Sequence, residues 1–252
     1  MTRIIAVAIT KGGTGKTTTV CNLGHGLALL KKKVLLVDCD TQGHLAAYWG
    51  LKPKPGYTIA EVLDPQVDRK PSRCLIEVRP GLNMMGSDRR SLAKAKLAMA
   101  QDQMGMGAFW LRDRLAELST YDYILLDTAP SWDILSMAAL LASQEVLMPI
   151  STEFLTIASA TDYVQVVADV QKHNPQLKIS WILPTFLDAR TKRSLDILQA
   201  LRQHFLELVV DPIRINSDLS SAASYHKSIF EHAPASRGAE DYLALVERIA
   251  NA

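Results

Sequence analysis

The residues best suited to chemistry lie in one short stretch, "ITKGGTGKTTT", at residues 9–19. In the common phosphate-binding loop, Gly-x4-Gly-Lys-Thr/Ser, the lysine reaches the β and γ phosphates and the next hydroxyl ligates Mg²⁺. Lys16 and Thr17 occupy those two positions. Backbone N–H groups can turn toward a phosphate at three glycines, Gly12, Gly13 and Gly15. A helix that begins near Lys16 would add its positive N-terminal end, so the stretch predicts an anion site.

The same stretch departs from the common loop in two places. Thr10 stands where the first glycine is expected, and Lys11 is an additional lysine. Lys16 already serves the nucleotide of its own chain, and Lys11 leaves the preceding strand on the opposite shoulder of the loop. A second cation there is most useful if it faces a partner, as a clamp that couples ATP to dimerisation. A solvated surface lysine is the alternative.

Three carboxylates could complete such a site, since Mg²⁺ and an attacking water both need positioning during phosphoryl transfer. Asp127 ends the apolar run "YILLD", and Asp38 and Asp40 end "VLLVDCD". Each of them could instead cap a loop.

The elements around these residues alternate between short apolar runs and amphipathic stretches of helical length. This order predicts an α/β fold, a mostly parallel twisted sheet with helices on both faces, in which ligands bind beyond the carboxyl ends of the strands. We expect one domain over residues 1–252, with residues 50–107 as a variable insertion-like region within it. The expected strands are 4–9, 34–40, 121–130, 145–150 and 179–186, and the expected helices 16–30, 156–173 and 191–206. In the variable region we expect a short helix near 58–63, a hairpin near 74–85 and a helix over about 88–103.

Together, "KGGTGKTTT", "VDCDTQG" and "YDYILLDTAPS" resemble the ParA/MinD family of deviant Walker-type ATPases, as do "LPTFLDART" and "SRGAEDYLAL". The resemblance implies a P-loop ATPase that binds ATP and Mg²⁺ and forms a homodimer with ATP. It implies that Lys11 crosses the dimer interface, that Asp40 orients the hydrolytic water, and that Asp38 and Asp127 act around Mg²⁺ with Thr17. It also assigns nucleotide contacts to Lys11, Gly12, Gly13, Thr14, Gly15, Lys16, Thr17 and Thr18, and adenine contacts to Thr185 and Asn216.

Several relatives and locations are disfavoured by the composition. The three cysteines, Cys21, Cys39 and Cys74, lack CxxC spacing, which favours buried thiols over an iron–sulfur cluster and suits a reducing cytosol. The apolar run "IIAVAI" is far too short to span a bilayer. The C-terminal "AEDYLALVERIANA" is not basic enough for a MinD-like membrane helix, so we expect no membrane partner and a face that docks on the core: Tyr242, Leu243, Leu245, Val246 and Ile249. We expect a cytoplasmic, nucleoid-associated protein.

A net charge of +2 does not mark the whole surface as basic, so DNA binding would need a local patch. The best candidate is "DARTKRS", with Arg190, Lys192 and Arg193 at the start of a helix, and Arg214 near it; a solvated helix start is the alternative. Further cations could extend the patch: Lys172, Lys178, Arg202 and Lys227. Asp218 stands where relatives usually have an arginine, which indicates a divergent branch.

The expected function is an Mg²⁺-ATP-dependent dimerising ATPase that binds DNA without sequence preference and positions or segregates a plasmid, a chromosome or a protein microcompartment. A ParB-like or adaptor partner would stimulate its hydrolysis. The alternatives are a biosynthetic ATP-dependent ligase or amidase on the same fold, or a MinD-like membrane-associated ATPase. Met99, Met104 and Met106 could form an adaptable partner surface, fill the core or lie in a loop.

Overall fold

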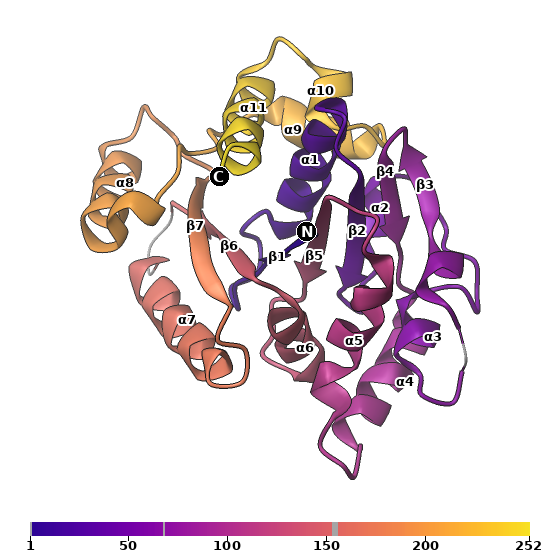
Figure 1. Ribbon diagram of the computed structural model, residues 1–252. Coiled ribbons are helices and arrows are strands. Elements are labelled where there is room, and N and C mark those ends of the chain that lie inside the picture. Colours follow the sequence, from indigo (N-terminus) through magenta and orange to yellow (C-terminus); the bar gives the residue numbers. More distant parts are fainter. Residues whose placement is uncertain (1, 68, 153–155) are drawn as a thin grey trace.

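A seven-stranded sheet forms the centre of the computed structural model, which describes residues 2–67, 69–152 and 156–252 (Figure 1). Its strand order is β3-β4-β2-β5-β1-β6-β7, and only β3 runs antiparallel to its neighbour. The strands are β1 (Arg3–Val7), β2 (Val34–Cys39), β3 (Ile76–Arg79), β4 (Leu82–Met85), β5 (Tyr123–Thr128), β6 (Glu145–Ser151) and β7 (Lys178–Thr185). β2, β5 and β6 are buried along their whole length, as near-continuous apolar runs predict.

Helices cover both faces of this sheet (Figure 1). One face carries α1 (Lys16–Leu29), α2 (His44–Tyr48), α9 (Ser217–Ser224), α10 (Ile229–His232) and α11 (Arg237–Ala250). The other carries α3 (Ile59–Leu63), α4 (Arg89–Ala100), α5 (Trp110–Leu115), α6 (Ile134–Ala142) and α7 (Thr156–Gln171), while α8 (Lys192–Phe205) lies beside β7. Four short 3-10 turns complete the described chain: Pro71–Cys74, Gly107–Phe109, Ala116–Leu118 and Leu206–Leu208. The predicted fold class is therefore confirmed.

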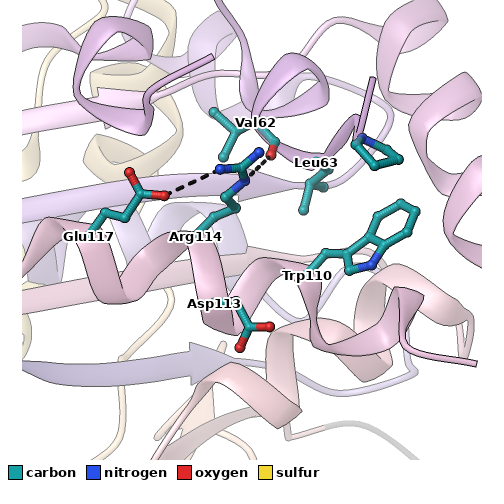
Figure 2. Close-up of a pocket in the computed structure, with 7 residues that line it drawn as sticks. Val62, Leu63, Trp110, Asp113, Arg114 and Glu117 are labelled. Atoms are coloured by element: carbon teal, nitrogen blue, oxygen red, sulfur yellow. Dashed lines mark hydrogen bonds and ion pairs between the residues drawn. The ribbon is translucent and has the colours of Figure 1, made fainter. Parts of the chain in front are cut away.

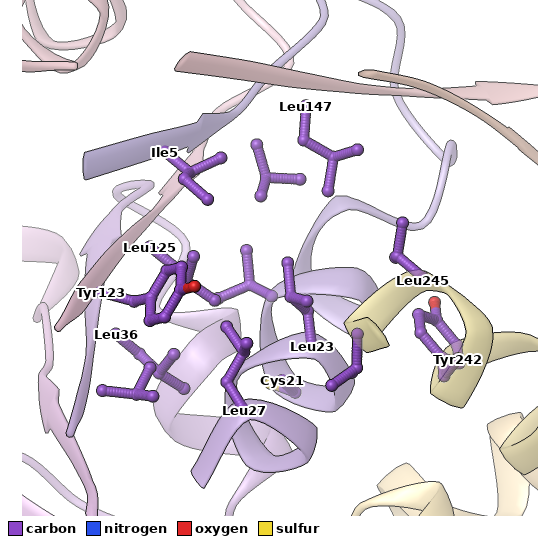
Figure 3. Packing of buried hydrophobic residues seen from close by; sticks show 14 of the residues in the cluster. Ile5, Cys21, Leu23, Leu27, Leu36, Tyr123, Leu125, Leu147, Tyr242 and Leu245 are labelled. Atoms are coloured by element: carbon purple, nitrogen blue, oxygen red, sulfur yellow. The ribbon is translucent and has the colours of Figure 1, made fainter. Parts of the chain in front are cut away.

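The helix after the phosphate loop is fixed by packing on both of its sides. Leu23 and Leu27 of α1 lie against strand residues such as Leu36 and Leu125, and α11 closes the opposite side with Tyr242 (Figure 3). Burying a side chain of this size contributes about 1.5–3 kcal/mol. This packing holds the start of α1, and with it the phosphate loop, in one place at the end of β1.

The structure of residues 50–107 also follows its sequence pattern. Residues 59–63 form α3, whose N-cap Thr58 makes a capping box with Glu61, and β3 and β4 form the predicted hairpin. Of the three methionines, Met99 fills the core, whereas Met104 and Met106 are exposed. All three cysteines are buried free thiols, as expected. One prediction for the C-terminal helix is wrong: Leu243 is 45% exposed, because it lies on the outward face of α11.

Candidate nucleotide-binding site

The phosphate loop joins β1 to α1 with backbone conformations that favour glycine. Gly13 and Gly15 have φ angles of 72° and 84°, in the left-handed region that side chains with a Cβ rarely adopt. Gly15 is the N-cap of α1, and no side chain caps this helix end. The first N–H groups of α1 are therefore available to an anion that lies in the loop.

Lys16 folds back over this loop. Its Nζ donates to the carbonyl oxygens of Ile9, at 3.3 Å, and of Lys11, at 3.1 Å. Burial lowers the pKa of Lys16, while the nearby carboxylates of Asp127 and Asp40 act in the opposite direction. A phosphate in the loop would replace these weak carbonyl contacts with charge-assisted hydrogen bonds.

The two carboxylates predicted to lie near Mg²⁺ end neighbouring strands. Asp38 of β2 pairs in register with Asp127 of β5, so both side chains lie at the same edge of the sheet. Thr17 donates from Oγ1 to Asp127 Oδ2 at 2.7 Å, which brings the hydroxyl and the carboxylate together.

Three buried oxygens at this edge have no hydrogen-bond partner in the described part of the chain: Asp38 Oδ2, Asp127 Oδ1 and Thr14 Oγ1. Burial raises the pKa of Asp127 to about 7 and that of Asp38 well above its usual range, and the mutual repulsion of the two carboxylates adds to the effect at Asp38. Orphaned oxygens with raised pKa values are what a cation site presents when no cation is bound, so these residues fit Mg²⁺.

A magnesium ion bound with a nucleotide needs few ligands from the protein. Among the described residues, no three His, Cys, Asp or Glu side chains form a group that could hold a metal by themselves. Mg²⁺ in nucleotide sites keeps several waters and uses one or two protein oxygens besides phosphate. When bound, the ion neutralises charge that develops on the transferred phosphoryl group. Thr17 and Asp127 would hold it here, with Asp38 beside them.

Asp40 lies just beyond β2 in a hydrogen-bonded loop. Its Oδ1 accepts from the N–H of Gln42 at 3.0 Å, and its carbonyl oxygen accepts from Ser87 Oγ at 2.9 Å. The second contact joins the Asp40 loop to the segment before α4. Ser87 was not predicted, and its type and position in the sequence give no signal of this role.

The side chain of Lys11 has a different partner from that of Lys16. It is half-buried, and its Nζ donates to Ser151 Oγ at the end of β6, at 3.3 Å. The acceptor in this contact is a neutral hydroxyl, which is a weaker partner for an ammonium than a charged phosphate oxygen.

A pocket of about 280 Å³ adjoins the loop on the side of β7 and α9. Thr185 and Asn216, predicted as adenine contacts, both line it, together with Thr18 and Gly15. Thr185 Oγ1 donates to the carbonyl oxygen of Thr14 at 3.0 Å, so this hydroxyl holds the loop. The loop shares Gly15 and Thr18 with this pocket, and the hydrogen bond from Thr17 to Asp127 joins the loop to the carboxylate edge.

Phe186 is a pocket residue that sequence reasoning missed. It follows Thr185 directly, is 46% exposed, and its ring lies 3.8 Å from the position a Cβ on Gly15 would take. An aromatic residue at a strand's carboxyl end was the available signal. Its ring offers a flat apolar wall to a base.

The predicted DNA residues differ in how their charges are compensated. Arg190 forms an ion pair with Asp188 at 2.9 Å, and Lys192 and Arg193 occupy the exposed first turn of α8. Arg214 is held otherwise: its Nε donates to Asp241 at 2.9 Å, and Glu240 is a second partner. Two carboxylates of α11 neutralise Arg214 and tie it to that helix, so its predicted contact with DNA would require these ion pairs to break. Of the cations expected to extend that surface, Lys172 pairs with Asp169 and Arg202 with Asp211.

Another hollow, of about 310 Å³, lies between α3 and α5 and contains none of the predicted site residues (Figure 2). Trp110 and Leu63 line its apolar side. Arg114 reaches from α5 to the carbonyl oxygen of Val62 at 3.1 Å and pairs with Glu117. The contact between Arg114 and Val62 ties α5 to α3, which is a structural role.

The raised pKa of Asp127 predicts how stability depends on pH when no metal or nucleotide is present. The folded pKa of about 7 exceeds the unfolded value of about 3.9, so the folded state binds more protons between these values. Its stability therefore falls as pH rises through this window. We expect Asp127→Asn, measured by thermal melting in EDTA, to melt several degrees higher than the parent at pH 8 and nearly equally at pH 5.

The same variant should lose the stabilisation that Mg²⁺-ATP gives the parent, because the neutral amide is a poor ligand for a hard cation. Glu117→Gln, at a half-exposed surface pair, is the matched control and should show neither effect. If the Asp127 variant and the parent melt at the same temperature at pH 8, the carboxylate of Asp127 does not have a raised pKa in the folded state.

Comparison with known proteins identifies relatives that match nearly the whole chain. The family model described as an AAA domain matches residues 2–179. The sporulation initiation inhibitor protein Soj of Bacillus subtilis is 34% identical over 259 residues and covers 99% of each chain. The chromosome-partitioning ATPase Soj of Thermus thermophilus is 34% identical over 249 residues, covering 98% of this chain and 95% of that protein.

Among solved structures, cobyrinic acid a,c-diamide synthase from Mycobacterium smegmatis, with a bound ATP analog and magnesium, matches with a TM-score of 0.84. It is 30% identical and covers 100% of this chain and 95% of that one. No helix in the described residues is both long and apolar enough to cross a membrane.

Proposed function

This chain belongs to the ParA/MinD family of P-loop ATPases, and from that premise we propose that it is a nucleotide-switched positioning protein. It hydrolyses ATP and uses Mg²⁺, as its relatives do. In the proposed cycle, the ATP-bound chain dimerises and binds DNA without sequence preference. Hydrolysis then dissolves the dimer and releases the DNA, and repeated cycles position or segregate a cargo: a plasmid, a chromosome or a protein microcompartment.

One observation carries this proposal: two lysines leave the same loop in different directions. Lys16 Nζ lies over the loop against the carbonyl oxygen of Ile9, whereas Lys11 Nζ reaches Ser151 at the end of β6. A loop that served a single nucleotide would need only the first cation. The second supports a dimer in which each protomer completes the other's site.

The proposed DNA surface lies at the first turn of α8. Lys192 and Arg193 are exposed there, and the N-terminus of this 14-residue helix favours a phosphate. Arg190 would join them by exchanging Asp188 for a phosphate. Two or three contacts per protomer give weak binding, so we expect DNA to be held well only by the dimer, where the two surfaces act together.

A gel-shift or anisotropy titration with ATP, with ADP and without nucleotide tests this proposal. We expect binding to duplexes of any sequence with ATP alone, and a steep loss of affinity between low and moderate salt. Lys192→Glu combined with Arg193→Glu should weaken binding by about tenfold or more. Arg214→Ala should lower thermal stability and leave the affinity for DNA close to that of the parent. ATP-independent binding, or no effect of the α8 changes, would exclude this surface.

A second candidate function is favoured by the structural relative, which is a diamide synthase 30% identical to this chain. A ligase or amidase would couple ATP hydrolysis to an acceptor that becomes amidated. Measuring ATP turnover with and without DNA and with and without an ammonia donor separates the two candidates. Hydrolysis that needs an acceptor molecule and ignores DNA would favour the ligase or amidase.

We also propose that a ParB-like or adaptor protein stimulates hydrolysis. Release of DNA by hydrolysis needs an external trigger, because a dimer that hydrolysed ATP quickly by itself would release the DNA before the cargo moved.

A further inference from the structure

We propose that the exposed side of α4 and the turn after it bind a helical segment of a partner protein, one that carries acidic side chains about two turns away from large apolar ones. We call this surface the α4 face and define it by five residues: Arg89, Arg90, Leu97, Met104 and Met106. The inference rests on the proposed function in one respect, since the partner would be the adaptor that regulates hydrolysis.

The first observation is an excess of positive charge, although the N-cap carboxylate of Asp88 interacts with Arg90. α4 carries four basic residues and no acidic one along Arg89–Ala100. Lys96 is paired with Asp133 at 2.6 Å, and Lys94 lines a groove that also contains carboxylates of α3. Arg89 and Arg90 are exposed, and neither forms an ion pair with any residue that the structure describes. This differs from Arg190 and Arg214, whose charges are neutralised within the chain.

The second observation is a group of large apolar side chains that the core does not use. Leu97 is 57% exposed, Met104 84% and Met106 46%. Leu97 lies seven residues after Arg90, which on a helix is two turns, about 10 Å, along the same side. Unbranched methionine side chains suit an adaptable contact surface.

The turn that carries the methionines is held in place. The N–H of Met106 donates to Asp102 Oδ2 at 2.6 Å, and Gly107 lies so close to the backbone of Met99 that a Cβ there would be 2.1 Å from its carbonyl oxygen. Met104 and Met106 are thus presented at the end of α4 by a fixed turn. A fixed apolar surface loses less entropy on binding than a mobile one.

The third observation links the α4 face to hydrolysis. Ser87, just before α4, donates to the carbonyl oxygen of Asp40, and Lys96 of α4 reaches Asp133 at the start of α6. A cavity of about 360 Å³ lies between them, and both Asp40 and Lys96 line it. A partner that shifts α4 would therefore act on the loop of Asp40, the residue expected to orient the hydrolytic water, and on the start of α6.

Charge and apolarity together favour a protein segment over nucleic acid. A phosphate backbone would engage Arg89 and Arg90 and leave the leucine and methionines in water. An acidic, apolar helix satisfies both halves of the surface at once.

Synthetic helical peptides of about 20 residues test the proposal with the full chain, by fluorescence anisotropy and by ATP turnover. The panel contains an acidic and apolar peptide, its scrambled form, a basic and apolar peptide, and an acidic peptide whose leucines are replaced by serine. We expect only the first to bind and to raise ATP turnover. Arg90→Glu should weaken it about tenfold or more, and so should Leu97→Ser with Met104→Ser.

Matched controls lie elsewhere on the surface. Arg73→Glu changes an exposed arginine and Leu29→Ser a leucine that is 53% exposed, and both should bind the peptide as the parent does. Equal binding of the serine-substituted acidic peptide would overturn the proposal, and so would binding of the scrambled peptide. If a DNA duplex displaces the peptide and is itself lost in Arg90→Glu, the α4 face binds nucleic acid and the proposal fails.

Loss of ATP-dependent dimerisation in Arg90→Glu would show instead that a second copy of this chain covers the face, which also overturns the proposal. Light scattering and DNA retention with ATP are measured on the same samples. A parent that dimerises and holds DNA but ignores the peptide refutes this inference and leaves the positioning function standing.

Discussion

With Lys11→Gln, ATP no longer produces a dimer, although the variant still binds ATP. This is the result we expect from light scattering combined with a fluorescent-nucleotide titration. Glutamine keeps most of the stem and an N–H donor on the side of Ser151, but it carries no charge. Removing one partner of a buried charge pair at an interface costs about 2–5 kcal/mol, or roughly 30-fold or more in the dimer dissociation constant.

Two comparisons make the Lys11 result specific. Lys33→Ala changes an exposed lysine at the opposite end of the sheet and should dimerise like the parent. Lys16→Gln should lose ATP binding itself, because Lys16 lies within the loop of its own chain. A Lys11→Gln protein that dimerises with ATP as the parent does would mean that Lys11 is an ordinary surface lysine, and the trans clamp would have to be abandoned.

The sequence predicted the order of the sheet's elements because buried parallel strands leave a strong signal. Runs such as "VLLVDCD" and "YDYILLDTAP" are apolar on both sides, and only a sheet covered by two helical layers buries both. The same logic located Asp38 and Asp127 at strand ends, and the register of β2 with β5 places them side by side. The observed strand bounds differ from the predicted ones by only one to a few residues, which is the usual uncertainty at the ends of secondary-structure elements.

What the sequence did not predict depends on contacts between distant segments. Ser87 reaches Asp40 across 47 positions, and Arg214 finds Asp241 27 positions later. Serine and arginine occur at many positions of the sequence, and nothing near Ser87 or Arg214 indicates these partners. Only the folded structure shows that Ser87 bridges two segments and that Arg214 is neutralised. Leu243 was predicted to lie on the docking face of α11 for a related reason. Several apolar residues share this helix, and the sequence alone does not show which of them faces outward.

The distribution of cations shows why composition alone is a weak guide to DNA binding. Arg190, Arg202 and Arg214 all have carboxylate partners within the chain, although the sequence places them among basic neighbours. Exposed ion pairs contribute little to stability, so Arg190 can still exchange Asp188 for a phosphate. Arg214 holds two carboxylates, one of them on a buried side chain, and would lose far more.

Asp40→Ala should bind ATP and dimerise but hydrolyse ATP about 100-fold to 1000-fold more slowly, so that the dimer accumulates. The reason is that Asp40 lies beyond β2 beside the carboxylate edge, where it can orient a water without being needed for phosphate binding. Its Oδ1 also holds the N–H of Gln42, so Asp40→Asn is the necessary companion: it keeps that acceptor and removes the charge.

Equal loss of turnover in Asp40→Asn and Asp40→Ala would assign the effect to the carboxylate, whereas recovery in Asp40→Asn would assign it to the shape of the loop. Single-turnover measurements distinguish slow chemistry from slow product release, because only the former leaves ATP intact in the accumulated dimer. Asp64→Ala removes a carboxylate of the α3–α4 groove and should leave turnover unchanged. If Asp40→Ala turns over ATP at the parental rate, the water must be oriented by other groups, and Asp40 is then a residue that only shapes the loop between β2 and α2.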